Sequence, residues 1–146
     1  MKTVGYDPFL DAERAAAISP NLRFTDDLLD LCASCDYITI HVPATPKTKG
    51  MIGADEIAAM KEGAAFLNFS RDTLVDNDAM RAGLASGKVR RYVTDFATPE
   101  VMTMEGALVL PHLGASTAEA EENCAEMAVR EVMDYLETGK KVHCVN

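Results

Sequence analysis

The fold is decided by residues 64–96, which read A-A-F-L-N-F-S-R-D-T-L-V-D-N-D-A-M-R-A-G-L-A-S-G-K-V-R-R-Y-V-T-D-F. Two short runs rich in apolar and β-branched residues, Ala64–Asn68 and Arg91–Phe96, flank a helical pattern over Asp76–Ala85. Gly87 follows that pattern, and glycine is favoured just after a helix because it adopts the left-handed backbone conformation. A strand, a helix and a second strand in this order predict a βαβ unit with parallel strands.

The same alternation continues toward both ends of the chain. Further strands are predicted at Thr3–Asp7, Tyr37–Val42 and Ala107–Leu110, with Leu22–Phe24 as a candidate short strand. Further helices are predicted at Asp11–Ile18, Asp26–Ser34 with Thr25 as its N-cap, and Ala54–Met60. Several strands are apolar almost throughout, which is expected when helices cover both faces of a sheet. The sequence therefore predicts an α/β fold with a doubly wound parallel sheet of the Rossmann type.

A long helix is predicted after residue 116. Ser116 and Glu119 have the spacing of a capping box, and Gly139 offers a left-handed C-cap after about 22 residues. Its apolar positions recur at helical spacing and predict a buried stripe, formed by Cys124, Met127, Ala128, Val132 and Leu136.

Composition excludes several classes of partner. The chain has 146 residues, 48% of them hydrophobic and 25% charged, which is typical of one globular domain. Its formal net charge of -9 leaves no basic face for nucleic acid or for an anionic membrane surface. No apolar run approaches the roughly 20 residues that span a bilayer, so we expect no membrane insertion and a cytoplasmic location.

The cysteines are expected to be reduced thiols, because four scattered residues form no disulfide framework. Cys32 and Cys35 match C-x-x-C, a spacing found in redox pairs and in half of a zinc site, which His41 or His143 could complete. The favoured interpretation is packing, because the pair ends an amphipathic helix and the sequence has no second C-x-x-C. We predict no metal site.

The first predicted strand ends in Asp7. An acid at the end of the second strand of a Rossmann unit accepts hydrogen bonds from the ribose hydroxyls of adenosine, and its charge favours NAD over NADP. The Gly-rich turn that should lie about 20 residues earlier has no place in this chain. We therefore expect a partial Rossmann domain that lacks the central first strand and its Gly-rich loop. The chain would be a fragment, residues 1–146 forming the C-terminal part of the domain, unless another chain supplies that strand.

Three motifs follow predicted strands, where open α/β sheets bind their ligands. They read I-H-V-P-A-T-P-K-T over 40–48, L-N-F-S-R-D-T-L-V-D over 67–76 and L-P-H-L-G-A-S-T over 110–117. In this order and at these separations, they resemble the D-2-hydroxy-acid dehydrogenase family across essentially the whole chain. The variants N-F-S-R-D and V-T-D-F look closest to the 3-phosphoglycerate dehydrogenases, which open serine biosynthesis.

The resemblance implies two principal catalytic residues. Oxidation of a hydroxy acid needs a base for the C2 hydroxyl proton, and histidine suits that role near neutral pH, so His112 is the expected base. A planar arginine can hold the substrate carboxylate in a bidentate manner, and Arg71 matches that position. The family has glycine after this arginine, whereas Asp72 stands here. The alternative for Arg71 is a surface ion pair with Asp72.

A third catalytic residue is expected to be a glutamate that pairs with the histidine and fixes its orientation. Glu100 lies five residues after Asp95, as in the family, but it follows Pro99 where the family has glutamate before proline. Glu105 is the second candidate, and an exposed loop carboxylate without a catalytic role is the third interpretation.

The resemblance also implies NAD as the cofactor. It assigns Asp7 to the adenosine ribose, Val42 and Pro43 to the adenine side and Asp95 to the carboxamide, whereas His41 orders a strand end. The nicotinamide end would be lined by Phe69, Ser70, Arg71, His112, Gly114 and Ala115.

The expected function is that of an NAD-dependent dehydrogenase that acts on a 2-hydroxy or 2-oxo acid. We expect the chain to be an inactive fragment of it, because the substrate domain is absent, and we expect the whole protein to be a homodimer. Phosphoglycerate is the favoured substrate, and lactate or glyoxylate and hydroxypyruvate are alternatives. A non-catalytic, NAD-sensing interaction module of the same fold is a different class of function that these residues also allow.

Overall fold

The computed structural model describes residues 1–19 and 21–143, so the expectation of a reduced Cys144 lies outside the described residues. The chain divides into two compact units, Met1–Pro111 and His112–Asn146. No helix of the described residues is long and apolar enough to cross a membrane.

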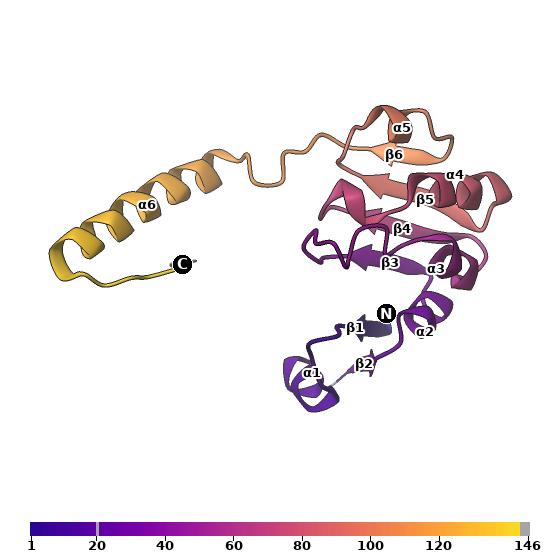
Figure 1. The fold of residues 1–146 in the computed structure, drawn as a ribbon, viewed down its shortest axis with the longest axis horizontal. Helices are drawn as coiled ribbons and strands as arrows, with labels where there is room; N and C mark the ends of the chain where they lie inside the picture. The colour runs from indigo at the N-terminus through magenta and orange to yellow at the C-terminus, as the bar shows by residue number, and fades with distance from the viewer. Residues whose placement is uncertain (20, 144–146) are drawn as a thin grey trace. The chain divides into compact units, whose positions relative to one another are not determined.

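The first unit contains two parallel sheets (Figure 1). One pairs β1 (Thr3–Tyr6) with β2 (Leu22–Thr25). The other has the order β3-β4-β5-β6, formed by Tyr37–Ile40, Ala64–Asn68, Val89–Thr94 and Ala107–Val109. All of these strand pairs are parallel. The predicted α/β class is confirmed, including the short strand β2.

The helices of this unit follow the predicted order. They are α1 (Ala12–Ile18), α2 (Leu28–Ser34), α3 (Ala54–Ala59), α4 (Asn77–Ser86) and α5 (Pro99–Met102), with a 3-10 turn, η1, at Asp72–Leu74. The sequence interpretation missed η1 and α5, because each is too short to show a helical period. The prediction that Thr25 is the N-cap of α2 is wrong, because Thr25 ends β2. The N-cap is Asp27, whose carboxylate accepts the N–H of Leu29 at 2.8 Å.

The predicted gap in the sheet lies between β1 and β3. Within the described residues, β1 pairs with no strand other than β2, and β3 pairs with no strand other than β4. A Rossmann sheet places its first strand between these two strands. The architecture is therefore that of a partial Rossmann domain, as predicted.

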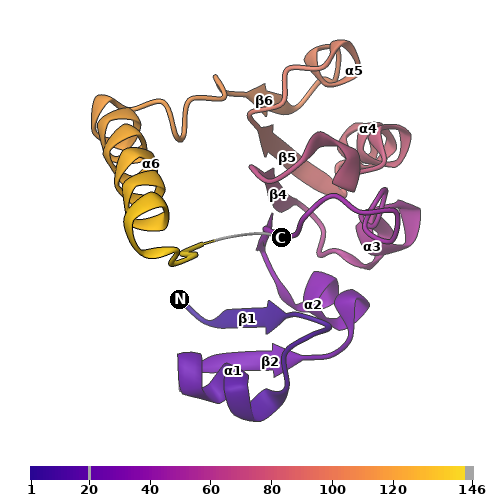
Figure 2. The same cartoon turned by 60° about the vertical axis from the view of Figure 1, so that its left-hand side comes forward.

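The core of the first unit lies between the four-stranded sheet and the helices α3 and α4, which stand on the same side of it in Figures 1 and 2. Phe66 and Tyr92 are buried there with ring centroids 6.2 Å apart. The opposite face of the sheet is exposed, since Tyr37 is 65% and Leu108 51% accessible. Within residues 1–111, helices therefore cover one face of this sheet and burial along β3 alternates, so the expectation that helices also cover the other face stays a prediction.

The cysteines of the C-x-x-C spacing pack into this core, as predicted. Cys32 is fully buried, and Cys35 is half-buried against the same cluster. Burial raises the pKa of the Cys32 thiol to about 11. The two histidines considered as zinc ligands contact other groups: His41 lies 2.8 Å from Thr39 Oγ1, and His143 lies 2.7 Å from Glu131 Oε1.

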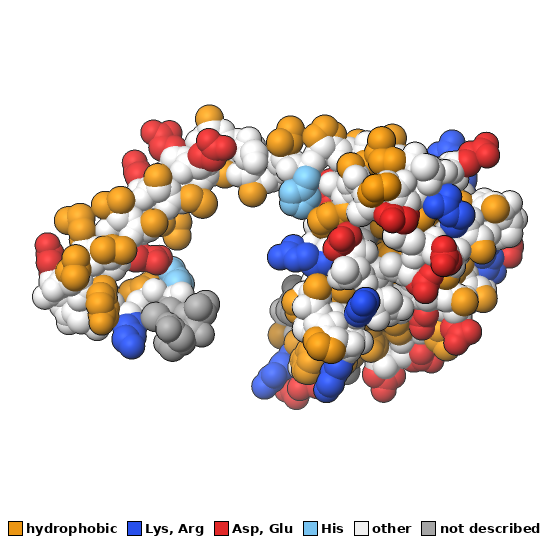
Figure 3. All heavy atoms as spheres, turned by 45° about the horizontal axis from the view of Figure 1, so that its top comes forward, with side chains coloured by type: hydrophobic (Ala, Val, Ile, Leu, Met, Phe, Trp, Pro, Cys, Tyr) orange, Lys and Arg blue, Asp and Glu red, His pale blue; other side chains and the backbone are white. Residues whose placement is uncertain are grey.

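The second unit is dominated by α6 (Ala118–Thr138). Its N-cap is Thr117, whose hydroxyl accepts the N–H of Ala120 at 3.1 Å, so the predicted capping box at Ser116 is wrong by one residue. Gly139 ends the helix in the left-handed conformation, as predicted. Within the second unit by itself α6 buries none of its residues, and apolar side chains lie along it (Figure 3), so the burial of its apolar stripe stays a prediction.

Candidate functional site

The loop that follows β4 carries three of the predicted site residues. Phe69 is 39% accessible, Ser70 is half-buried and Arg71 is exposed. The Ser70 hydroxyl donates to the carbonyl of Val42 at 2.7 Å, which joins the end of β4 to the segment after β3. The Arg71 guanidinium donates to the Ser70 carbonyl at 2.6 Å. The loop is therefore fixed at its middle, while the arginine side chain remains accessible to a ligand.

Arg71 and Asp72 each have a backbone partner of their own. The Asp72 carboxylate accepts the N–H of Thr73 at 2.8 Å and opens the turn η1. Both side chains are exposed. These contacts give Asp72 a local role in the turn, and the guanidinium of Arg71 retains donors for a carboxylate ligand.

The side chain of Asn68 binds the backbone of this loop. The sequence interpretation gave this residue no role. It is fully buried at the end of β4. Its side-chain amide donates to the Arg71 carbonyl at 2.8 Å and to the Tyr92 hydroxyl at 3.5 Å, and its oxygen accepts the N–H of Ser70 at 3.1 Å. A polar residue at an apolar strand end was the available signal, because a buried amide requires partners.

Thr94 performs the equivalent task at the end of β5 and was also missed. It is fully buried, its hydroxyl donates to the Asn68 carbonyl at 2.8 Å, and the same oxygen accepts the N–H of Phe96 at 3.2 Å. Burial of the neighbouring Tyr92 raises the pKa of its hydroxyl, so that this group stays neutral while it accepts from the Asn68 amide. The two strand ends and their loops thus form one connected polar network.

The segment after β3 carries Val42 and Pro43, the residues assigned to the adenine side. Val42 is half-buried and Pro43 exposed. The Thr48 hydroxyl donates to the Pro43 carbonyl at 2.7 Å and accepts the N–H of Thr45 at 2.8 Å, which closes the segment into a compact turn. Since β3, β4 and β5 are parallel, these residues, Arg71 and Asp95 all lie at the carboxyl edge of one sheet.

Asp7 follows β1 and is exposed. One carboxylate oxygen accepts the N–H of Phe9 at 2.8 Å, which orients the side chain at the strand end. A carboxylate accepts hydrogen bonds and donates none, which suits the two hydroxyls of an adenosine ribose and disfavours a phosphate there. The residue therefore fits NAD.

The loop after β5 leads from Asp95, which is half-buried, into α5. Thr98 caps this helix, and Glu100 lies in its first turn with an exposed side chain. Glu105 is exposed in the turn before β6. Glu100 therefore has a defined helical position, whereas Glu105 belongs to a connecting turn.

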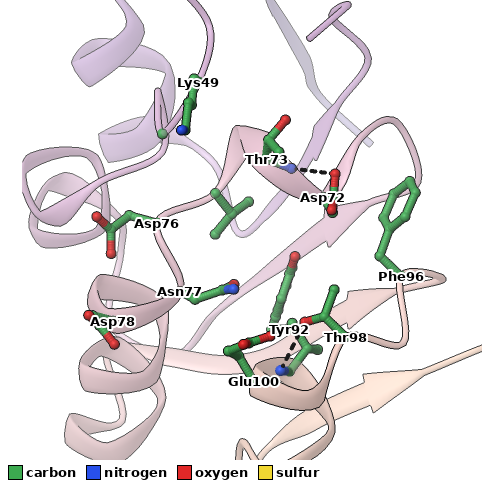
Figure 4. A pocket seen from close by; sticks show the side chains of 13 residues that line it. Lys49, Asp72, Thr73, Asp76, Asn77, Asp78, Tyr92, Phe96, Thr98 and Glu100 are labelled. Atoms are coloured by element: carbon green, nitrogen blue, oxygen red, sulfur yellow. Dashed lines mark hydrogen bonds between the residues drawn. The ribbon is translucent and has the colours of Figure 1, made fainter.

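A pocket of about 450 Å³ lies between the loop after β4 and α5 (Figure 4). Asp72 and Glu100 both line it, and the buried Tyr92 closes its inner wall. Its remaining charged residues are Lys49, Asp76 and Asp78. The residue next to Arg71 and the candidate acid Glu100 therefore border one cavity.

His112, Gly114 and Ala115 stand at the start of the second unit, and all three are exposed. The N–H of Ser116 donates to the Leu113 carbonyl at 3.0 Å, which forms a turn around Gly114 before α6 begins. The histidine thus lies in the segment that leads from β6 to α6, which begins at Ala118.

The parallel order of the strands and the polar loops at their carboxyl ends define a Rossmann-type nucleotide-binding fold. Residues 1–114 match the family model of the D-isomer specific 2-hydroxyacid dehydrogenase, NAD binding domain. The chain belongs to this family, whose members are NAD-dependent dehydrogenases, and its cofactor is NAD.

Individual relatives agree with this assignment. D-3-phosphoglycerate dehydrogenase of Methanocaldococcus jannaschii is 35% identical over 142 residues, which cover 93% of this chain and 27% of the relative. The holo form of D-mandelate dehydrogenase from Rhodotorula graminis superposes with a TM-score of 0.81 at 26% identity, covering 92% of this chain and 41% of that one. An NAD-complexed D-isomer specific 2-hydroxyacid dehydrogenase from Lactobacillus delbrueckii has a TM-score of 0.84 at 22% identity, covering 99% and 49%, which shows the shared fold.

Proposed function

We propose that the protein oxidises a D-2-hydroxy acid to the 2-oxo acid with NAD, and that the acid is 3-phosphoglycerate. The observation that carries this proposal is the loop after β4: the Asn68 amide of β4 holds the Arg71 carbonyl and the Ser70 hydroxyl donates to the Val42 carbonyl after β3, yet the Arg71 side chain is exposed. The substrate choice rests on curated relatives that are D-3-phosphoglycerate dehydrogenases, among them proteins at 32%, 35% and 38% identity. When bound, NAD supplies the hydride acceptor.

Each proposed catalytic residue has a separate role. Arg71 holds the substrate carboxylate through its planar pair of donors. His112 takes the proton from the C2 hydroxyl, and Glu100 pairs with the imidazole and fixes its orientation. Asp72 places a negative charge next to the carboxylate-binding arginine, so a substrate group that reaches its side of the pocket should be a hydrogen-bond donor.

The cofactor contacts are proposed at the strand ends. Asp7 accepts hydrogen bonds from the adenosine ribose, and Asp95 from the carboxamide. Backbone and apolar contacts come from the other members of the set, which are Val42, Pro43, Phe69, Ser70, Gly114 and Ala115.

The chain spans about a quarter of the length of the curated relatives that it matches. We therefore propose that the Gly-rich first strand and a substrate domain lie outside residues 1–146, and that these residues alone do not turn over substrate. The open edges of β1 and β3 support this proposal, since a strand seated between them would pair with both. We also propose a homodimer in the cytoplasm, where the cysteines stay reduced; light scattering would test the dimer.

The test is NADH formation by the full-length protein with 3-phosphoglycerate, D-lactate and D-glycerate. We expect 3-phosphoglycerate to react fastest, and His112→Asn to lose on the order of 10²–10⁴-fold in kcat while NADH binding, followed by fluorescence, is retained. Arg71→Met should raise KM. The exposed Arg14→Met, which changes the same residue type far from these loops in sequence, is the control.

Two results would contradict the proposal in different ways. Faster oxidation of another acid would change the substrate and keep the class of reaction. Tight NADH binding with no oxidation of any acid would favour the non-catalytic, NAD-sensing module instead.

A further inference from the structure

Arg81 reaches from α4 to the backbone of α5. Its Nη2 donates to the carbonyl of Glu100 at 2.9 Å and to the hydroxyl of Thr103 at 3.2 Å. Its Nη1 donates to the Thr103 carbonyl at 3.3 Å. One guanidinium therefore joins two carbonyls and a hydroxyl that lie 19 and 22 residues further along the chain.

The segment needs such support because α5 is only four residues long. The last carbonyls of a helix have no partner within the helix, and in a helix of one turn this applies to nearly all of them. The N-terminal end is held by Thr98, whose hydroxyl accepts the N–H of Val101 at 3.3 Å. Val101 and Met104 anchor one side of the segment in the core at 3% and 5% exposure.

The Glu100 carbonyl is the point where these contacts converge. Besides Arg81, the Thr103 hydroxyl donates to it at 2.9 Å. The backbone of Glu100 is thus held by two donors, while its side chain is exposed and borders the pocket that Asp72 also lines (Figure 4). Arg81 is not among the residues that line this pocket, so it acts from outside the cavity.

We propose that Arg81 is a positioning residue for Glu100, and through it for proton transfer in the reaction. This inference rests on the proposed function, in which Glu100 orients the catalytic histidine. Arginine suits the task because its planar fork presents several donors in fixed directions, whereas the ammonium of lysine is a single point of contact. The contacts are to backbone and hydroxyl groups, so Arg81 sets where Glu100 stands and touches neither substrate nor cofactor.

The experiment compares Arg81→Met, Arg81→Lys and Thr103→Val in the full-length protein, with Arg14→Met as the matched control. We expect Arg81→Met to lower kcat on the order of 10-fold, because small displacements of a catalytic group are costly, and to change KM by less than about twofold. Arg81→Lys should recover part of the loss, and Thr103→Val should show a smaller loss of the same kind. The control should match the wild type.

A double-mutant cycle separates positioning from general stability. If Arg81 acts through Glu100, then Arg81→Met adds little to the loss already caused by Glu100→Gln. Independent, multiplying losses would overturn the inference, as would an unchanged kcat in Arg81→Met. Should Arg81→Met fail to fold, Arg81→Lys and Thr103→Val in the same cycle decide. A wild-type protein that oxidises no 2-hydroxy acid would instead refute the proposed function, and the inference with it.

Discussion

Replacing Asn68 with alanine removes the side chain that ties the Arg71 loop to the sheet. The amide makes hydrogen bonds of 2.8 Å to the Arg71 carbonyl and 3.1 Å from the Ser70 N–H, and each should contribute about 1 kcal/mol to stability. The Tyr92 hydroxyl, 3.5 Å away, would lose a buried partner at a cost of about 1 kcal/mol more. We therefore expect a loss of about 3 kcal/mol in the free energy of unfolding.

The functional effect should fall on substrate binding. Freed from Asn68, the loop would hold Arg71 less well, and KM for the 2-hydroxy acid should rise by about 10-fold or more. NADH binding should change less, because Asp7 and Pro43 lie on other strand ends. Urea unfolding and steady-state kinetics of the full-length protein measure the two effects.

Asn77→Ala provides the matched control, since it makes the same chemical change at the first position of α4, where the side chain is only half-buried. We expect its stability to stay within about 0.5 kcal/mol of the wild type. If Asn68→Ala were as mild as this control and KM did not move, the buried network would not be what holds the loop.

Three further outcomes are expected. Gly83→Ala would place a Cβ 2.7 Å from Ile57 Cγ2, and this overpacking should exceed the helix-propensity gain of about 1 kcal/mol, so that calorimetry shows a lower Tm; a higher Tm would mean that the helices separate easily. The buried Cys32 thiol should resist an alkylating reagent that modifies the exposed Cys124, and rapid labelling of both thiols in mass spectrometry would contradict this. Because folding raises the pKa of Cys32 to about 11 from 9.0, the contribution of this thiol to stability should be complete below pH 9 and be lost as the pH rises toward 11, which urea titrations at several pH values check. Asp7→Asn should weaken NADH binding by about 10-fold and narrow the preference over NADPH in calorimetry of the full-length protein, and an unchanged preference would remove Asp7 from the ribose site.

The sequence determined the class of fold and supplied the residues of the candidate site. Strand and helix periods over residues 64–96 were sufficient for the βαβ unit, because side chains alternate in a strand and recur every 3.6 residues in a helix. Motif residues such as Arg71 and His112 could be predicted because they lie within short contiguous stretches. Helix ends were predicted less accurately than helix interiors. Thr117 rather than Ser116 caps α6, because the sequence pattern does not distinguish two neighbouring residues that both carry a hydroxyl.

Only the tertiary structure decided what holds that site in place. Asn68 meets Tyr92, and Arg81 meets Glu100 and Thr103, across separations of 19 to 24 residues that no local period records. The sequence likewise did not predict that one face of the four-stranded sheet is exposed within the first unit, because an apolar strand has the same composition whether one face or both are covered. Local sequence specifies which elements form, since their backbone hydrogen bonds and periods are local. The partners of a buried amide or of a guanidinium are set by how those elements pack, and so they appear only in the folded chain.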